Sequence, residues 1–575
     1  MLCEKFEVED EEMTYDVIVV GSGNGACGFL SHYLKLDSEQ SPIEKVVVIE
    51  EGDDFFNTSD ITHQNNWTKS YAEGNIFKLH KAKTPDGIPI ISGWACTMGG
   101  GGSINYTMIH ESSEWLAQNI GRDKAYWDSL KAELNQKFLR ENPTKNLSPV
   151  TKTVIKAAEE EGFHISTDTI ENIPNYREGN TNWLHIFPTQ FNFFGQRTNS
   201  GVSLVNWFDQ SVEIKTRCRV VKLELTNDPE DKARCVGIYV QYLDTDKKEF
   251  LPLSDNGKLI MCAGAATPKL LWLQRERLEN AEIGRYVSDH IVLPLGVYVP
   301  DKKIDVTPKD VYVPVFATTV WQPEAQGKPT VCCFDFFAGD FEKLWFIISH
   351  LYLTFLLPNW LKKIVIQVPL LFYITKNFVR ILIQLVNFFI NLWMGISNTI
   401  QGKPWDQELE LITAIVKFNP AMDGYYSGDG SEITLGFFTE DKRGVLPSSF
   451  NQDKEVAKSV IKKQLALLNR LGQKPHWLFK FVFRLFTKIP YEPEQVERYV
   501  DVYSRKFLLS EQHLAGGCLF NKAIDTGMNN VTNTGKLYGS ANVYIADLST
   551  VPLPRISPQM TAYIIGFHVA KSLKP

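Results

Sequence analysis

Cysteine is scarce in this sequence, with nine residues in 575. The odd number argues against a disulfide framework and fits a reduced, intracellular setting. Only Cys332 and Cys333 are adjacent, and neither a CxxC pair nor a zinc-like Cys/His spacing occurs. We therefore expect no metal site.

A basic excess is also missing, because 60 Lys and Arg stand against 67 Asp and Glu, for a formal net charge of −7. A nucleic-acid-binding protein would normally show the opposite balance, so we expect no nucleic-acid partner. Residues 1–14 are acidic and lack the apolar core of a secretory signal, which also favours an intracellular protein. A chain of this length exceeds what one small core usually serves, so two joined domains are expected.

The first motif is typical of dinucleotide binding. Residues 15–20 form a β-branched run that predicts a buried parallel strand, and GSGNGA follows directly at residues 21–26. In this GxGxxA pattern Gly21 permits a tight turn, Gly23 lets the backbone approach a pyrophosphate, and Ala26 lets the next helix pack on the strand. On this motif alone, a tight turn without a ligand remains the alternative.

Two further features strengthen the nucleotide prediction. The apolar run at residues 46–49 ends at Glu50, whose carboxylate is suited to accept hydrogen bonds from the ribose hydroxyls of adenosine. Residues 98–105 read MGGGGSIN, and four consecutive glycines can present bare backbone N–H groups to a phosphate or a flavin ring.

Five separated blocks, in order along nearly the whole chain, resemble the glucose–methanol–choline (GMC) oxidoreductase family, which depends on FAD. They are the GSGNGA turn with Glu50, the MGGGGSIN loop, the CAGA block with Pro268 and Leu271 at residues 262–271, the segment 283–290 that resembles GxxxxDH, and residues 513–561. The last block contains HLAGGC, VYIAD and SPQMT, and looks most like the cholesterol oxidase and long-chain alcohol oxidase branch.

The resemblance implies an α/β fold, α+β overall. We expect a Rossmann-like FAD-binding domain assembled from residues 14–110, 197–295 and 505–575. Residues 111–196 and 296–504 should form a substrate-binding domain with an antiparallel sheet and a hydrophobic helical insertion.

The resemblance also assigns candidate site residues. His513 should lie beside the flavin and act on the substrate hydroxyl; hydride transfer from an alcohol needs a partner for the hydroxyl proton, and imidazole titrates near neutrality. Trp94 stands where some relatives carry a histidine bonded to FAD, so non-covalent FAD is expected. The implied FAD-binding residues are Gly21, Gly23, Asn24, Gly25, Ala26, Glu50, Met98, Gly100, Gly101, Gly102, Asn105, Val220, Ala263, Gly264, Asp547, Pro558, Gln559 and Met560.

One position departs from the family pattern. Before the final proline, where the family usually places asparagine or a second histidine, this chain has Ser557, the second candidate catalytic residue. A serine can donate or accept a hydrogen bond but cannot replace a histidine base.

Residues 341–400 are intensely apolar and carry five basic residues against one acid. No uninterrupted apolar run in them reaches the roughly 18 to 20 residues of a bilayer-spanning helix. Within residues 377–398 polar side chains recur every three or four positions, which predicts a helix with a narrow polar stripe and a wide apolar face. In HWLFKFVFRLFTKI at residues 476–489, His476, Lys480, Arg484 and Lys488 fall at steps of four, which is typical of a basic amphipathic helix.

These segments predict a monotopic membrane patch, with core packing or contacts between copies of the chain as alternatives. The expected function is FAD-dependent oxidation of an alcohol on a lipid-like substrate (a fatty alcohol, sterol or terpenoid) at a membrane surface, with O2 or a quinone as electron acceptor. Two alternatives stay open. Ser557 favours non-redox or light-driven flavin chemistry (a lyase, an isomerase or a fatty-acid photodecarboxylase), and the apolar segment favours a flavin-bearing subunit of a membrane complex.

Overall fold

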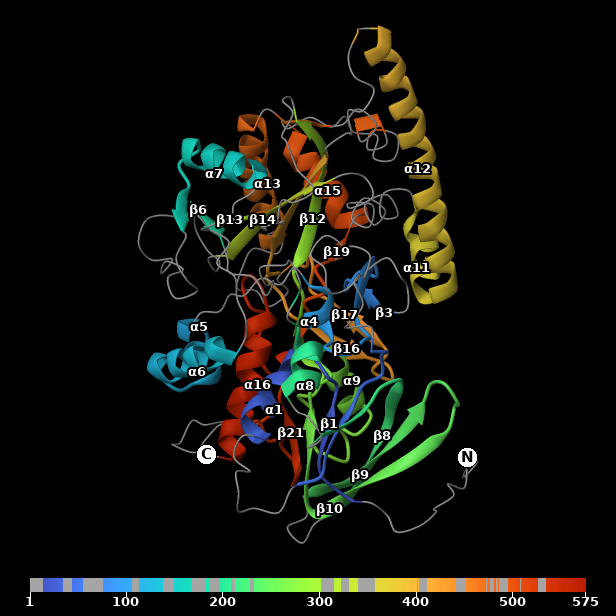
Figure 1. The fold of residues 1–575 in the computed structure, drawn as a ribbon, viewed down its shortest axis with the longest axis vertical. Coiled ribbons are helices and arrows are strands. Elements are labelled where there is room, and N and C mark those ends of the chain that lie inside the picture. The colour runs from blue at the N-terminus through green and yellow to red at the C-terminus, as the bar shows by residue number, and fades with distance from the viewer. Residues whose placement is uncertain are drawn as a thin grey trace.

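The structure is a computed structural model of the chain (Figure 1). It describes residues 14–34, 44–54, 76–105, 113–137, 149–166, 182–186, 197, 199–207, 212–227, 232–300, 315–321, 330–339, 357–400, 402, 411–440, 451–471, 473–475, 480–481, 484, 495–506, 508–525 and 534–574.

The first sheet has seven strands in the described part of the chain, in the order β7-β2-β1-β10-β9-β8, with β21 also paired to β10. Strands β7, β2, β1, β10 and β21 are parallel, whereas β9 pairs antiparallel with β8 and with the first half of β10. Their bounds are β1 (Tyr15–Val20), β2 (Val46–Ile49), β7 (Val212–Lys215), β8 (Cys218–Asn227), β9 (Ala233–Tyr242), β10 (Lys248–Met261) and β21 (Val543–Ile545). Because the parallel strands are covered on both faces, β1 and β2 are almost continuous runs of Val and Ile.

Two helices, α1 (Asn24–Tyr33) and α16 (Gln559–Leu573), lie side by side against this sheet (Figure 1). The packing is closest at glycine, since a Cβ at Gly28 would meet the carbonyl oxygen of Tyr563 at 2.1 Å. Farther along, the ring of His32 bonds the carbonyl of Lys574. The two helices therefore run in the same direction, and both begin at the same end of the sheet.

The second sheet has 14 strands among the described residues and is mostly antiparallel. Its order is β20-β11-β16-β17-β3-β4-β19-β12-β15-β14-β13-β6-β5, with β18 also paired to β12. The bounds are β3 (Phe77–Lys83), β4 (Pro89–Ala95), β5 (His164–Ser166), β6 (Asn182–Ile186), β11 (Arg285–Ser288), β12 (Ile291–Pro300), β13 (Val315–Trp321), β14 (Thr330–Gly339), β15 (Leu411–Phe418), β16 (Gly424–Ser427), β17 (Glu432–Thr434), β18 (Gln473–Pro475), β19 (Leu509–Ser510) and β20 (Ala515–Gly517).

The remaining helices cover the two sheets. They are α4 (Gly101–Ile104), α5 (Ser113–Ile120), α6 (Lys124–Lys137), α7 (Pro149–Glu160), α8 (Ser200–Trp207), α9 (Ala266–Trp272), α11 (Asn359–Gln367), α12 (Pro369–Ile400), α13 (Gln452–Arg470), α15 (Val496–Lys506) and the 3-10 turn η7 (Leu548–Thr550). Each sheet has its own large apolar core. This is the mixed α/β fold that the sequence predicts.

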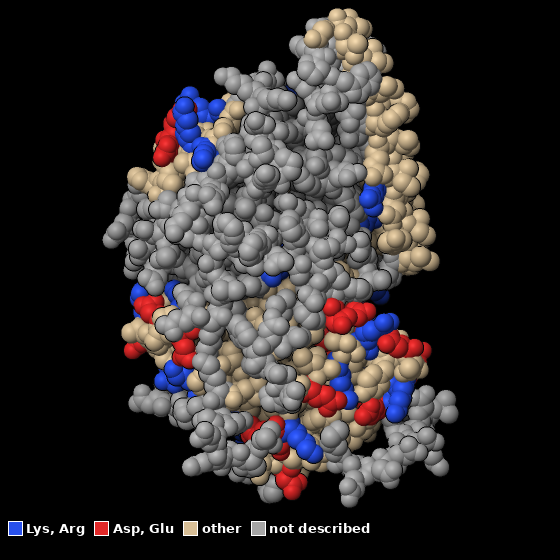
Figure 2. Space-filling model, viewed as in Figure 1, with Lys and Arg blue, Asp and Glu red and all other residues tan. Residues whose placement is uncertain are grey.

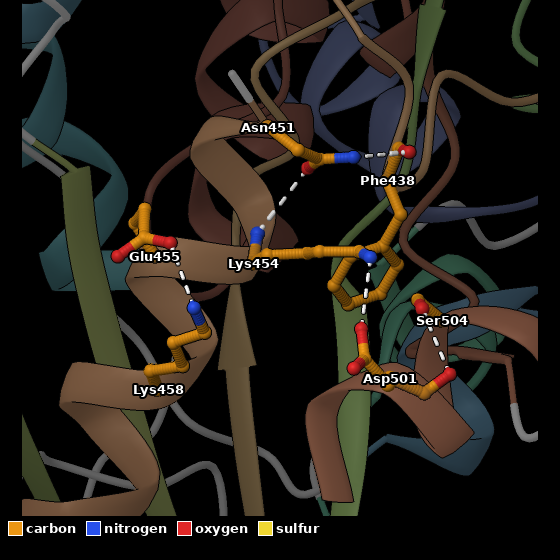
Figure 3. A network of polar contacts seen from close by, with 7 residues as sticks. All are labelled: Phe438, Asn451, Lys454, Glu455, Lys458, Asp501 and Ser504. Carbon is orange, nitrogen blue, oxygen red and sulfur yellow. Dashed lines mark hydrogen bonds and ion pairs between the residues drawn. The ribbon is translucent and has the colours of Figure 1, made fainter. Parts of the chain in front are cut away.

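Polar contacts fix two helices of the second core (Figure 3). Asn451 caps α13 by accepting from the backbone N–H of Lys454, and its amide donates to the carbonyl of Phe438 at 2.6 Å. The Lys454 ammonium then reaches Asp501 on α15 at 3.0 Å. An N-cap satisfies a backbone donor that the helix itself cannot pair, so this network sets where α13 begins.

The apolar insertion contains the helix predicted there. α12 has 32 residues, so it is about 48 Å long, and it extends along the side of the second core with α11 beside one end (Figure 1). Within the described ranges, none of the helices by itself has the length and apolar character to cross a membrane. Residues 359–365 and 370–382 have that length and character only when taken together, and a bend of 116° separates them. Residues 341–356 lie outside the described residues, as does 476–489 except for Lys480, Phe481 and Arg484, which are exposed.

Candidate FAD site and active site

The predicted FAD-binding residues gather at one edge of the first sheet. Strands β1, β2, β10 and β21 end at Val20, Ile49, Met261 and Ile545, and the motif residues follow each of these ends at once. Ligands of open parallel sheets bind beyond the carboxyl ends of the strands. The edge therefore brings together the GSGNGA turn, Glu50, the CAGA block and Asp547, although they are separated by hundreds of residues.

Ser22 connects two of the predicted blocks. Its hydroxyl donates to the Glu50 carboxylate at 2.6 Å and accepts from the backbone N–H of Gly99 at 2.9 Å. The other carboxylate oxygen of Glu50 accepts from the backbone N–H of Gly52. Ser22 was not predicted from the sequence because it occupies a variable position of GxGxxA; its short hydroxyl side chain between two glycines was the available signal.

The edge fits a dinucleotide with an extended pyrophosphate. A Cβ added at Gly23, Gly101 or Gly264 would meet open space, so the backbone there is bare. Neither α1 nor α16 has a side-chain cap at its first turn. Two neighbouring helix N-termini thus offer uncapped N–H groups and positive dipole ends, which favour a phosphate at one helix and the electron-rich edge of a flavin at the other.

A buried polar atom points to the same conclusion. The side-chain oxygen of Asn24 is buried, and no hydrogen-bond partner for it occurs among the residues described. Such a group is costly unless a bound molecule or water satisfies it. The glycine loop at residues 98–105 packs closely against this first turn of α1. A Cβ added at Gly102 would lie 2.1 Å from the Oδ1 of Asn24, and a Cβ added at Gly100 would lie 3.1 Å from the Cα of Gly23.

The glycine loop at residues 98–105 is held in place by hydrogen bonds from α8 and from the residues before that helix. Arg197 is buried and donates to the carbonyl and the side chain of Asn105 at 2.5 and 2.9 Å, at the end of α4. Ser200 donates to the carbonyl of Gly99 at 2.6 Å. Met98 is fully buried, so the start of the loop is fixed by packing as well.

The remaining predicted residues take different positions. Asp547 is buried and uses both oxygens, accepting from Gly264 and Thr267 with one and from Ser549 with the other, so it ties the CAGA block to the turn before α16. Val220 lies on β8 opposite Val240, just after Cys218, whose N–H bonds the carbonyl of Glu50. Gln559 and Met560 are buried in the first turn of α16.

His513 lies next to a second histidine. Its Nδ1 is 3.0 Å from the Nδ1 of His290, with the ring planes nearly perpendicular at 78°. His290 is fully buried, whereas His513 is partly exposed. Burial lowers the pKa of His290 to about 3, and burial together with the nearby His290 and Lys417 lowers the pKa of His513 well below its usual value. Both imidazoles are therefore neutral near pH 7.

The neutral pair couples the tautomers of the two rings. One Nδ1 must donate and the other must accept, because two lone pairs or two protons cannot face each other at this distance. In the arrangement in which His513 donates, its Nε2 carries a lone pair and can accept a proton from an alcohol. His290 is the acceptor that this arrangement needs, although from the sequence it was only part of a motif.

Asp289 holds the two histidines together through the backbone. One of its oxygens accepts from the N–H of His290 at 2.8 Å and from the N–H of His513 at 3.0 Å. Burial raises the pKa of Asp289 to about 7. Nearby, Lys417 and Glu511 form a buried ion pair at 3.4 Å.

Ser557, the second predicted catalytic residue, is buried immediately before α16. Within the described chain, the hydrogen bonds given above for His513 go to His290 and Asp289 rather than to Ser557. Its role in the reaction stays a prediction. When bound, FAD would accept the two electrons released when the alcohol carbon is oxidised.

Similarity to known proteins indicates the family of this chain. A family model described as GMC oxidoreductase matches residues 15–292. A protein of Acanthamoeba polyphaga mimivirus, named a truncated GMC-type inactive oxidoreductase, is 33% identical over 69 residues, which are 12% of this chain and 78% of that protein.

Solved structures share the fold over nearly the whole chain. Pyridoxine 4-oxidase from Mesorbium loti superposes with a TM-score of 0.64 at 14% identity, covering 98% of this chain and 99% of that one. A mutated formate oxidase from Aspergillus oryzae RIB40 gives 0.64 at 15% identity, covering 99% of each chain. An FAD-dependent oxidoreductase from Chaetomium thermophilum gives 0.60 at 13% identity, covering 98% of this chain and 99% of that one.

The matched family indicates FAD as the cofactor and oxidation of a CH–OH donor as the reaction type, and the bare backbone at the sheet edge fits the dinucleotide. The chain belongs to the GMC oxidoreductase family.

Proposed function

We propose that the protein oxidises the alcohol group of a lipid-like substrate, a fatty alcohol, sterol or terpenoid, to the aldehyde or ketone at a membrane surface. The observation that carries the oxidation is the neutral, partly exposed His513 paired with buried His290. Hydride removal from the carbinol carbon requires that the hydroxyl proton leave, and an unprotonated imidazole nitrogen can accept it.

The lipid-like substrate is supported by the surface of α12. Large apolar side chains such as Phe378, Phe388 and Phe389 are about three-fifths exposed there. A soluble enzyme for a polar alcohol has no need of such a surface, whereas an enzyme that takes its substrate from a bilayer does. The proposed acceptor is O2, as the names of the oxidases among the structural neighbours suggest, with a quinone as the alternative.

The test is anaerobic stopped-flow absorbance of the purified protein mixed with fatty alcohols, sterols and terpenoid alcohols. One class should bleach the flavin band near about 450 nm in the dark. His513→Ala should retain FAD and slow this bleaching about 10²-fold or more, while His164→Ala, whose exposed side chain lies on β5 at the edge of the second sheet, should leave the rate unchanged.

A panel that leaves the flavin band unchanged would overturn the proposal. Product formed from a fatty acid only under blue light would then favour the light-driven alternative, for which Ser557 is the supporting residue. Unchanged bleaching in His513→Ala would remove that residue from the role of base. Acid denaturation tests the non-covalent attachment, because the flavin should separate from the protein.

A further inference from the structure

The outward side of α12 is apolar, unlike the outward side of a helix in a soluble domain. The side facing the second core includes the buried Phe372 and Val379, but also Lys376, which is only 2% exposed, and the partly buried Arg380. The outward side carries Phe378, Leu385 and Phe388, exposed by 59%, 50% and 61%. In a soluble domain the apolar side faces the core and the charged side faces water.

The exposed apolar surface is concentrated at this one place. Sixteen of the twenty large hydrophobic side chains that are exposed among the described residues lie between Trp360 and Ile400, on α11 and α12. In Figure 2 the outer side of α12 forms a long column almost without charge, with basic atoms at its inner edge, whereas the other described surfaces mix both signs. Monomeric soluble proteins rarely expose apolar patches of this extent.

We propose that this apolar face of α11 and α12 docks on an anionic phospholipid bilayer, with α12 lying in the plane of the headgroup boundary. Charge selects lipid over a second copy of the chain. Residues 357–400 contain no acidic residue, although the whole chain is net −7; of their four basic residues Lys363 is exposed and Arg380 partly exposed, whereas Lys362 and Lys376 are buried. Lys480 and Arg484, from the second predicted segment, are also exposed. Two copies docked through this face would bring these exposed basic residues together with no acidic residue of 357–400 to pair them, whereas an anionic surface neutralises them.

The docking face is attached to the elements that carry the active site. Asn359 at the start of α11 donates to the carbonyl of Arg505, and Lys362 donates to that of Lys506, so α11 caps the end of α15. The chain continues from there through β19 to His513. α11 also contacts β3 and β4, and β4 pairs with β19. A docked α11 would thus hold the substrate side of the enzyme close to the bilayer, a consequence that rests on the proposed function.

The test uses full-length holoprotein and vesicle flotation without substrate. We expect the protein to float with vesicles of phosphatidylcholine and phosphatidylserine, and less with phosphatidylcholine alone. Phe388→Glu combined with Phe389→Glu should lower the floated fraction about tenfold or more, because two aromatic rings no longer enter the lipid. Leu273→Glu is the matched control, since Leu273 is 60% exposed but lies beyond α9.

Equal FAD content in the three proteins shows that each has folded. The proposal is overturned if the wild-type protein remains in the bottom fraction of the gradient with both vesicle types, or if the double variant floats as well as the wild type. It is also overturned if the free protein is a dimer that only the double variant converts to a monomer, because the face would then serve a second copy. Flotation needs no turnover, so its failure and the failure of the alcohol panel are separate results.

Discussion

Replacement of His290 by leucine tests the assignment of His513 as a base most directly. The side chains have similar volume, so the fold should persist, but in the tautomer that makes His513 a base its Nδ1–H loses the acceptor that lies 3.0 Å away. As the alcohol proton arrives, His513 becomes an imidazolium, and a hydrogen bond from a charged donor contributes about 1.5–3 kcal/mol. At about 1.4 kcal/mol per factor of ten, flavin reduction should slow about 10- to 150-fold.

The assay is the single-turnover rate of flavin reduction as a function of substrate concentration. The limiting rate should fall while the apparent substrate affinity stays the same, because His290 is fully buried and His513 is partly exposed. His290→Gln provides the matched comparison, since its amide oxygen can again accept from His513 and should restore much of the rate. Flavin reduction at the wild-type rate in His290→Leu, with normal FAD content, would refute the tautomer argument.

The remaining predictions concern charge, stability and cofactor binding. Lys417→Met, made together with Glu511→Gln so that no buried charge is left unpaired, removes a positive charge that lowers the pKa of His513. The pKa of His513 should therefore rise. Because the neutral form is the base, flavin reduction measured over a pH series should begin to fall at a higher pH than in the wild type. Asn451→Ala removes the N-cap of α13 and should cost about 0.5–2 kcal/mol in urea unfolding, whereas Lys458→Ala, which breaks an exposed ion pair, should cost under about 1 kcal/mol. Ser22→Ala loses two buried hydrogen bonds and should weaken FAD binding about tenfold in a fluorescence titration; unchanged affinity would show that the hydroxyl does not organise the site.

Much of the FAD site could be predicted from the sequence because it is built from local patterns. A β-branched run, a glycine turn and the start of a helix are decided within about a dozen residues, so the turn at residues 21–26 is where the sequence places it. Glu50 and Asp547 follow the same rule, since each stands directly after a short apolar strand. Parallel strands then bring their carboxyl ends to one edge whatever their separation along the chain.

The partners of these motifs depended on tertiary structure. Ser22 meets Gly99, and His290 meets His513 across 223 residues, and no periodicity encodes such contacts. Ser557 stands where the family usually places asparagine or a second histidine, and a serine cannot replace a histidine base. The fold supplies a second histidine, His290, from the turn before β12, because β19 pairs with β12 and carries the start of the His513 segment to it.

The sequence by itself determined that residues 377–398 form a helix with a polar stripe and an apolar face, because both follow from the helical repeat. It could not determine which side faces the protein. Only the packing of the second core decided that Lys376 turns inward and Phe388 outward. A helical pattern fixes the angle between its two faces but not the direction of either, since that direction depends on what the rest of the chain places beside the helix.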